Sequence, residues 1–245
     1  MDITDGVLVL TSRTMHTTTT VLHEGSCAVV VDPAWHADEL ASLADLLTSR
    51  GLIPVLGWAT HAHHDHVLWH PDLGTPPRLA SPAAAQDAAA HLSQLRAALD
   101  MPPDLLSLAG EIAAHDGDRL PWQGPVAQIL THHAHSPGHT ALWLAGPRVL
   151  IAGDMLSDVE IPLLEGSTPA QYRAGLELLA PFVEQAQILI PGHGTVARAG
   201  RADSPTGRLA ADRRYLDRPD LPDPRLRRAE PWLLEAHQEN LGRMR

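Results

Sequence analysis

The sequence predicts an α/β domain in which helices pack outside two central sheets. Short runs of β type alternate along the chain with segments whose apolar residues recur at helical spacing. Several of these short runs are apolar enough to be buried strands. The 245 residues are 44% hydrophobic and 19% charged, which is an ordinary globular composition. Strands and helices that alternate in this way are typical of layered α/β folds.

In the first half of the chain, β-branched and apolar runs predict four strands, at residues 7–11, 18–23, 27–32 and 54–60. Between the third and the fourth, residues 36–50 place leucines on one helical face and end at Gly51, so a helix is expected there. Residues 82–99 are also predicted to be helical, because Ser81 can cap the first turn and Pro82 suits its first position.

In the second half, strands are predicted at residues 126–131, 140–145, 148–152 and 188–190. Thr168 can cap a helix over 169–183, and two further helices are expected after Ser204 and after Pro224. The stretch 69–122 is less regular and rich in proline, alanine and leucine. It is the expected place for a lid or an insertion, with plain surface packing as the alternative.

Composition narrows the function classes. The single cysteine, Cys27, excludes an internal disulfide and a cysteine metal cluster. A net charge of −11 disfavours a general polyanion-binding surface. Residues 198–245 differ, with 11 arginines against 8 acidic residues; an arginine-bearing helical surface is expected there, and a nucleic-acid or partner contact is the alternative. No apolar run approaches the roughly 20 residues that a helix needs to cross a bilayer. The first residues carry no basic group, which a signal peptide would have, so a cytoplasmic location without membrane contact is predicted.

Residues 60–66, with the sequence THAHHDH, carry the strongest chemical signal. They follow a predicted buried strand directly, at the end where α/β proteins commonly hold their sites. In an extended segment alternate side chains point the same way, so His61 and His63 can hold one ion together. If the chain then turns into a helix, Asp65 and His66 project toward a second point. Imidazole and carboxylate groups suit zinc, and also iron or manganese.

Three later strands end in a residue of the same kind. His139 follows a Pro-Gly turn, and Asp154 and His193 each directly follow a glycine. Such glycines let the backbone approach closely without a clashing side chain. Among the neighbouring histidines, His135 is the alternative to His139 as a ligand. The sequence therefore predicts that ligand-type side chains gather from several strand ends.

This ordered set resembles the signature of the metallo-β-lactamase superfamily, in which H-x-H-x-D-H precedes a distant histidine, a distant aspartate and a final histidine. The resemblance covers about residues 7–197. It implies a four-layer αββα sandwich with the site at one edge of two sheets. Residues 1–197 would form the catalytic domain, and residues 198–245 a helical extension packed on it. It also implies a first metal on His61, His63 and His139, a second on Asp65, His66 and His193, and Asp154 as the bridge between both.

The chemistry that the resemblance implies is hydrolysis with two Zn²⁺ per chain, iron or manganese being possible replacements. Two ions about 3.5–4 Å apart share a water and lower its pKa toward about 7, so that hydroxide can attack a small ester, thioester or lactone. Asp65 is the expected catalytic residue, because it can orient the nucleophile or carry its proton. Four side chains are predicted to contact the small-molecule substrate: Trp69, Ser157, Tyr172 and Tyr215.

Two other activities remain open at this point. Some relatives bind iron and oxidise persulfides with much of the same signature, so an iron-dependent oxidoreductase like a persulfide dioxygenase is one alternative. A β-lactamase, a phosphodiesterase or a nuclease of the same superfamily is the other, although the acidic body argues against nucleic acid. The chain contains no lysine, so a substrate carboxylate would need an arginine or a hydroxyl. Substrate identity and oligomeric state are not determined by the sequence.

Overall fold

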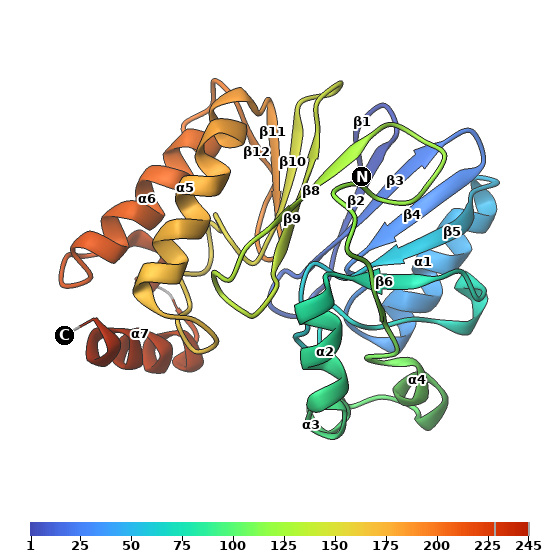
Figure 1. Cartoon of the computed structure of the whole chain (residues 1–245), viewed down its shortest axis with the longest axis horizontal. Coiled ribbons are helices and arrows are strands. Elements are labelled where there is room, and N and C mark those ends of the chain that lie inside the picture. Colours follow the sequence, from blue (N-terminus) through green and yellow to red (C-terminus); the bar gives the residue numbers. More distant parts are fainter. Residues whose placement is uncertain (228, 245) are drawn as a thin grey trace. The chain divides into compact units, whose positions relative to one another are not determined.

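The chain divides into two compact units, Met1–Ile129 and Leu130–Arg245, in a computed structural model that describes residues 1–227 and 229–244. Each unit contains one β-sheet with helices packed against it (Figure 1). The predicted α/β class is therefore confirmed.

The sheet of the first unit contains seven strands in chain order. Neighbouring strands are antiparallel from β1 to β4 and parallel from β4 to β7. Because β4 and β5 are parallel, the segments that follow them leave the sheet at the same edge. The strands are β1 (Asp2–Thr4), β2 (Val7–Thr11), β3 (Thr18–Glu24), β4 (Cys27–Val31), β5 (Ile53–Trp58), β6 (Arg78–Ala80) and β7 (Ala113–Ala114).

The helices of this unit are α1 (Ala37–Ser49), α2 (Pro82–Ala90), α3 (Leu92–Ala97) and α4 (Pro103–Leu108), with a 3-10 turn η1 (Pro71–Leu73). Leu43 and Leu47 of α1 pack against Val21 and Val30 of the sheet. The predicted helix over 82–99 is two helices, separated at His91. The stretch 69–122, the predicted place for a lid or an insertion, contributes β6 and β7 to the sheet.

The sheet of the second unit has the order β12-β11-β10-β9-β8. All five residues of β9 and of β10 are buried, as their apolar sequences predict. Strands β10 and β11 are parallel, so the residues after them emerge at one edge. The strands are β8 (Ala127–Thr131), within which the unit boundary falls, β9 (Thr140–Leu144), β10 (Val149–Gly153), β11 (Ile188–Pro191) and β12 (Ala197–Arg198).

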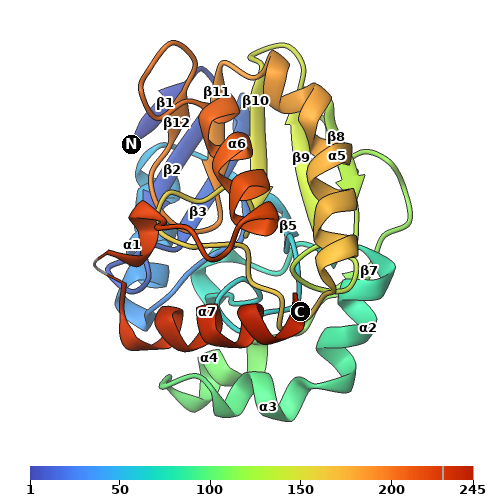
Figure 2. The ribbon, with the colours of Figure 1, turned by 90° about the vertical axis from the view of Figure 1, so that its left-hand side faces the viewer.

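Helices α5 (Pro169–Gln185) and α6 (Pro205–Asp217) lie along one face of this sheet, as Figures 1 and 2 show. Leu209 of α6 and Leu233 of α7 (Pro231–Arg243) belong to the same apolar core as β10. The arginine-rich segment after residue 198 is therefore packed into the second unit. Its last helix begins at Pro231 and not directly after Pro224, because Pro224–Leu226 forms a 3-10 turn, η2, instead.

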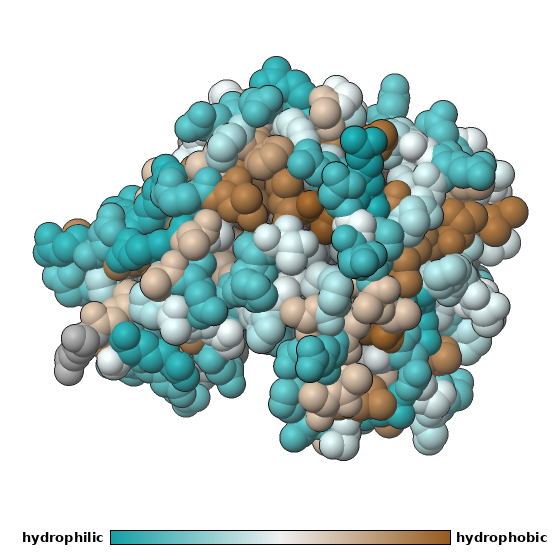
Figure 3. Space-filling model, viewed as in Figure 1, coloured by the Kyte–Doolittle hydropathy of each residue, from teal (hydrophilic) through white to brown (hydrophobic). Residues whose placement is uncertain are grey.

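Hydrophilic side chains dominate the face of the molecule drawn in Figure 3, with apolar side chains in small groups between them. Single large apolar residues are exposed, among them Ile53 and Val126, as is ordinary for globular proteins. Within the described residues, no helix combines the length and the apolar character needed to cross a membrane.

Candidate metal centre

The segment after β5 brings three histidine rings of the first unit together. The ring centroids of His61 and His63 are 4.5 Å apart, and those of His61 and His66 are 4.2 Å apart. The chain turns here without forming a helix: the amide of His66 donates to the carbonyl oxygen of His63 at 3.0 Å. This turn returns His66 toward His61, so the histidines of one short segment can face a common point.

Asp32, at the end of β4, orients the first of these histidines through Thr60. The Thr60 amide and hydroxyl both donate to the Asp32 carboxylate, each at 2.7 Å. Because its proton is used there, the hydroxyl oxygen of Thr60 accepts from His61 Nδ1 at 3.1 Å. A proton on Nδ1 leaves the lone pair on Nε2 of His61, which is the form that binds a metal.

The same carboxylate also faces His66. Asp32 Oδ2 lies 3.1 Å from His66 Nδ1, and on the other side of the ring Asp65 Oδ2 lies 3.2 Å from Nε2. Asp65 in turn accepts from the hydroxyl of Thr17 at 3.3 Å. Asp32 was not among the predicted site residues, although it is the last residue of a predicted strand, and a polar residue at a strand end is the signal that identified the others.

In the second unit, Asp154 follows β10 and lies between two imidazole rings. Its Oδ2 atom is 3.3 Å from His135 Nε2 and 3.3 Å from His193 Nε2. All three side chains are buried. His135 has a φ of 66° and Gly153 a φ of 55°, so left-handed backbone on both sides directs these groups toward each other.

His139, the predicted ligand, meets the backbone of Asp154 and not its carboxylate. Its Nε2 accepts a hydrogen bond from the backbone amide of Asp154 at 3.0 Å, and its ring stacks on His132 with 4.7 Å between centroids. A lone pair that is already bound to an amide is not available to a metal. The geometry of this unit therefore favours His135 as the ligand, whereas His139 binds the backbone amide of Asp154 and holds it in place.

Glu160 is a further acidic residue at this site that the sequence did not reveal. It is buried, and its Oε1 lies 3.8 Å from His193 Nδ1, on the side of the ring opposite to Asp154. Donor atoms of Asp154, Glu160 and His193 all lie within 4.8 Å of one another. A buried group of two carboxylates and one imidazole fits a divalent cation.

The loops after β10 and β11 are fastened to each other by hydrogen bonds. The hydroxyl of Ser157 donates to the carbonyl oxygen of His193 at 2.8 Å. Asp158 accepts from the amide and the hydroxyl of Thr195, at 2.9 and 2.6 Å. Gly192 allows this approach, since a Cβ there would collide with the Asp154 carboxylate. These contacts hold Asp154 and His193 in one arrangement.

The arginine-rich segment holds the first of these loops from outside. Arg225 Nη1 donates to the carbonyl oxygen of Glu160 at 2.9 Å and to Asp212 at 2.5 Å. Its Nη2 donates to Asp223 at 2.9 Å. Burial alone would lower the pKa of Arg225, but the two carboxylates beside it raise it above its usual value. Asp212 also accepts from the amide of Leu156 at 3.2 Å, so this ion cluster fixes the loop that carries Glu160.

Arg208 forms a second such connection. Its side chain is 3% exposed and pairs with Asp203 and, at 3.4 Å, with Asp158. It also donates to the hydroxyl of Thr195 at 3.1 Å. Two of the tail's arginines are thus internal structural groups, which the arginine count of the sequence did not indicate.

The four predicted substrate contacts are buried within their own units. Tyr172 belongs to the apolar core, and burial raises its pKa well above the usual value. Tyr215 also lies in that core, and its hydroxyl interacts with His237 Nδ1 at 2.9 Å. The indole of Trp69 donates to Gly74, and Ser157 serves the loop contact described above. These side chains have packing and positioning roles in their own units, and their contact with a substrate stays a prediction.

Comparison with known proteins identifies the family that shares this arrangement. The family model described as "Metallo-beta-lactamase superfamily" matches residues 13–193. A protein of Acidiphilium cryptum named hydroxyacylglutathione hydrolase is 30% identical over 241 residues, covering 92% of this chain and 88% of the relative.

Solved structures of low sequence identity share the fold. A metallo-beta-lactamase from Pontibacter korlensis superposes with a TM-score of 0.66 at 15% identity, over 86% of this chain and 96% of that one. The crystal structure of TTHA1623 in a di-iron-bound form has a TM-score of 0.61 at 23% identity, over 79% and 96% of the two chains. The predicted fold type is thereby confirmed.

Proposed function

Because the chain belongs to the metallo-β-lactamase superfamily, we propose that it is a metal-dependent hydrolase of small esters, thioesters or lactones. The observation that carries the proposal is the placement of buried histidines and aspartates at the ends of β5, β10 and β11. Thioesters are the first substrates to test, since the relative that spans most of this chain is named as a hydrolase of that kind.

The proposed metal ligands follow the family pattern, with one change. His135 replaces His139, because Nε2 of His139 accepts the Asp154 amide while Nε2 of His135 faces the Asp154 carboxylate. We propose one ion on His61, His63 and His135, a second on Asp65, His66 and His193, and Asp154 as a ligand to both.

When bound, two such ions supply Lewis acidity that lowers the pKa of water and polarises a carbonyl group. The residues of this chain prepare that chemistry. Asp32 keeps the Nε2 lone pair of His61 available by binding Thr60, whose hydroxyl oxygen accepts from His61 Nδ1. Its Oδ2 also lies 3.1 Å from His66 Nδ1. Asp65, held by the Thr17 hydroxyl, has a carboxylate oxygen with which to orient an attacking water and to accept its proton.

Two alternatives differ in their support. The di-iron form of a structural relative supports a test of iron and of persulfide oxidation. The nuclease alternative has less support from the arginine-rich tail, since Arg208 and Arg225 are paired internally with carboxylates. A β-lactamase activity, a cytoplasmic location and two zinc ions per chain stay predictions.

Metal analysis of the purified chain by plasma mass spectrometry, followed by a panel of glutathione thioesters, lactones and esters, tests the proposal. About two zinc ions per chain with thioester or lactone hydrolysis is the expected result. His135→Ala should lose metal, whereas His139→Ala should keep it at the same occupancy if folded. One iron per chain with oxygen uptake on persulfides would instead favour the oxidoreductase. A chain that binds no metal under any condition would refute the proposal.

A further inference from the structure

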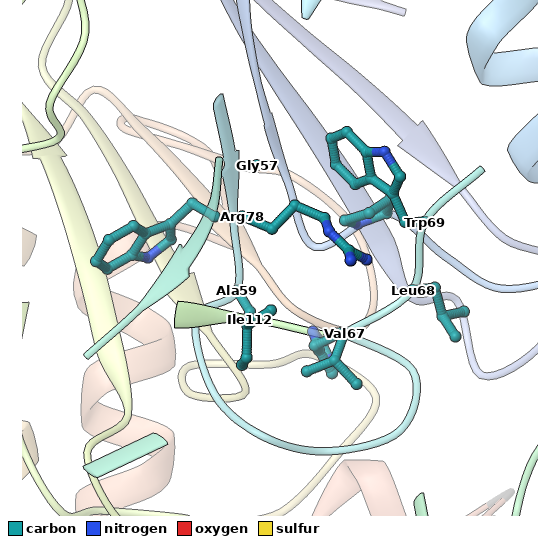
Figure 4. Close-up of a pocket in the computed structure, with 10 residues that line it drawn as sticks. Gly57, Ala59, Val67, Leu68, Trp69, Arg78 and Ile112 are labelled. Carbon is teal, nitrogen blue, oxygen red and sulfur yellow. The ribbon is translucent and has the colours of Figure 1, made fainter. Parts of the chain in front are cut away.

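Arg78, the first residue of β6, extends its side chain beside the ring of Trp69 (Figure 4). Its Cζ atom lies 5.8 Å from the ring centroid, a cation–π distance. Gly57 on the neighbouring strand opens this space, since a Cβ there would lie 2.8 Å from Trp69 and 3.1 Å from Arg78 Cγ. Val67 and Ile112 line the other side of the side chain. The guanidinium is therefore held in place by packing.

Among the described residues, Arg78 forms no ion pair with a carboxylate. The other buried or half-buried arginines of the described residues each form an ion pair, with a nitrogen within 4.0 Å of a carboxylate oxygen. They are Arg96, Arg208, Arg213 and Arg225. Arg78 has one hydrogen bond, from Nη1 to the carbonyl oxygen of Leu108 at 2.5 Å. Burial lowers the pKa of the Arg78 guanidinium. The charge of Glu111 raises this pKa, but the ion pair of Glu111 is with Arg96, at 2.7 Å. Most of the five N–H donors of this half-buried cation are thus left for another partner.

A cavity of about 500 Å³ opens beside the guanidinium, within the range typical of small-molecule sites. Trp69 and Leu108 give it apolar walls, and Thr75 adds a hydroxyl group. Asp104 also lines it and carries a negative charge that opposes a multiply charged ligand. None of its lining residues belongs to the proposed metal ligands.

We propose that this cavity binds a small aliphatic or aromatic monocarboxylate, whose carboxylate group pairs with Arg78. The planar guanidinium fork matches two carboxylate oxygens. The apolar walls suit the body of the ligand, and Asp104 selects a single negative charge over a phosphate. The proposal does not depend on the proposed hydrolase activity.

The test is titration calorimetry of benzoate into the full-length protein, as isolated. Loss of a charge-assisted hydrogen bond should weaken binding about tenfold in Arg78→Gln. Arg78→Lys keeps the charge but loses the fork, so its affinity should lie in between. Asp104→Asn should bind benzoate more tightly than wild type, because a repelling charge is gone. Arg119→Gln removes an exposed arginine of the same unit and is the matched control, with unchanged affinity expected.

Two results would overturn the inference. Wild-type protein that binds no benzoate has no such site. Equal affinity in wild type, Arg78→Gln and Asp104→Asn would mean that benzoate binds elsewhere, for example on a bound metal ion. If Arg78→Gln does not fold, Asp104→Asn still decides the matter, because it retains Arg78 and must raise the affinity.

Discussion

Replacing Arg225 with methionine should lower the free energy of unfolding more than any surface substitution. The Arg225 side chain is 5% exposed and lies between the carboxylates of Asp212 and Asp223, which are 2% and 4% exposed. Methionine keeps part of the apolar stem but leaves two buried carboxylates without their cation. Breaking a buried ion pair in this way costs about 3–5 kcal/mol, a large share of the roughly 5–15 kcal/mol that stabilises a domain.

Two further variants separate charge from packing. Arg213→Gln removes an arginine whose side chain is 40% exposed and which pairs with the exposed Glu177 at 2.9 Å, so it should cost less than about 1 kcal/mol. Adding Asp212→Leu and Asp223→Asn to Arg225→Met removes both uncompensated charges. That triple variant should recover most of the lost stability, because buried ion clusters can often be exchanged for apolar groups at about neutral cost.

Urea denaturation followed by circular dichroism measures these free energies, and a chelator competition measures zinc affinity in the folded variants. The triple variant is expected to be stable and yet to bind zinc more weakly, since Arg225 no longer holds the carbonyl oxygen of Glu160. If Arg225→Met costs no more than Arg213→Gln, the ion cluster does not stabilise the protein. If the triple variant binds zinc as tightly as wild type, the cluster does not position the site.

Asp32→Asn should reduce zinc affinity about 10- to 100-fold, because an amide offers one acceptor oxygen where Asp32 uses two, one for the Thr60 amide and one for its hydroxyl; unchanged affinity in the chelator competition would contradict this role. Gly192→Ala should lose metal, since the new Cβ would displace the Asp154 carboxylate, and full occupancy by mass spectrometry would refute the packing argument. A further prediction concerns the pH dependence of stability at Glu39. Partial burial raises the pKa of this carboxyl group. Hydrogen bonds from the backbone amides of residues 13, 35 and 36 and from the Ser12 hydroxyl lower it more, so that the net pKa lies below 4.5. Its stabilising contribution is therefore present above that pH and lost below it, so the difference in Tm between wild type and Glu39→Gln should shrink from about pH 6 to about pH 3; a constant difference would argue against it.

The sequence alone located most of the strands and the side chains that follow them. A buried strand reads as an apolar run, and polar groups such as Asp154 or His193 directly after such a run have to emerge at the edge of a sheet. The prediction failed for β6 and β7, which have only three and two residues. Strands this short carry no periodic signal, and they exist because a neighbouring strand offers its backbone groups.

Tertiary structure decided which polar groups face which. The spacing of residues along the sequence could not show which of His135 and His139 faces the Asp154 carboxylate, because the two lie four residues apart in an irregular loop. In the folded chain the His139 ring meets the Asp154 amide and the His135 ring meets its carboxylate. The arginine count of the tail likewise indicated a charged surface, whereas Arg225 is buried against Asp212. Hydrophobic patterning is local and can be read along the chain, but hydrogen bonds and ion pairs join residues distant in sequence, so only the folded chain specifies them.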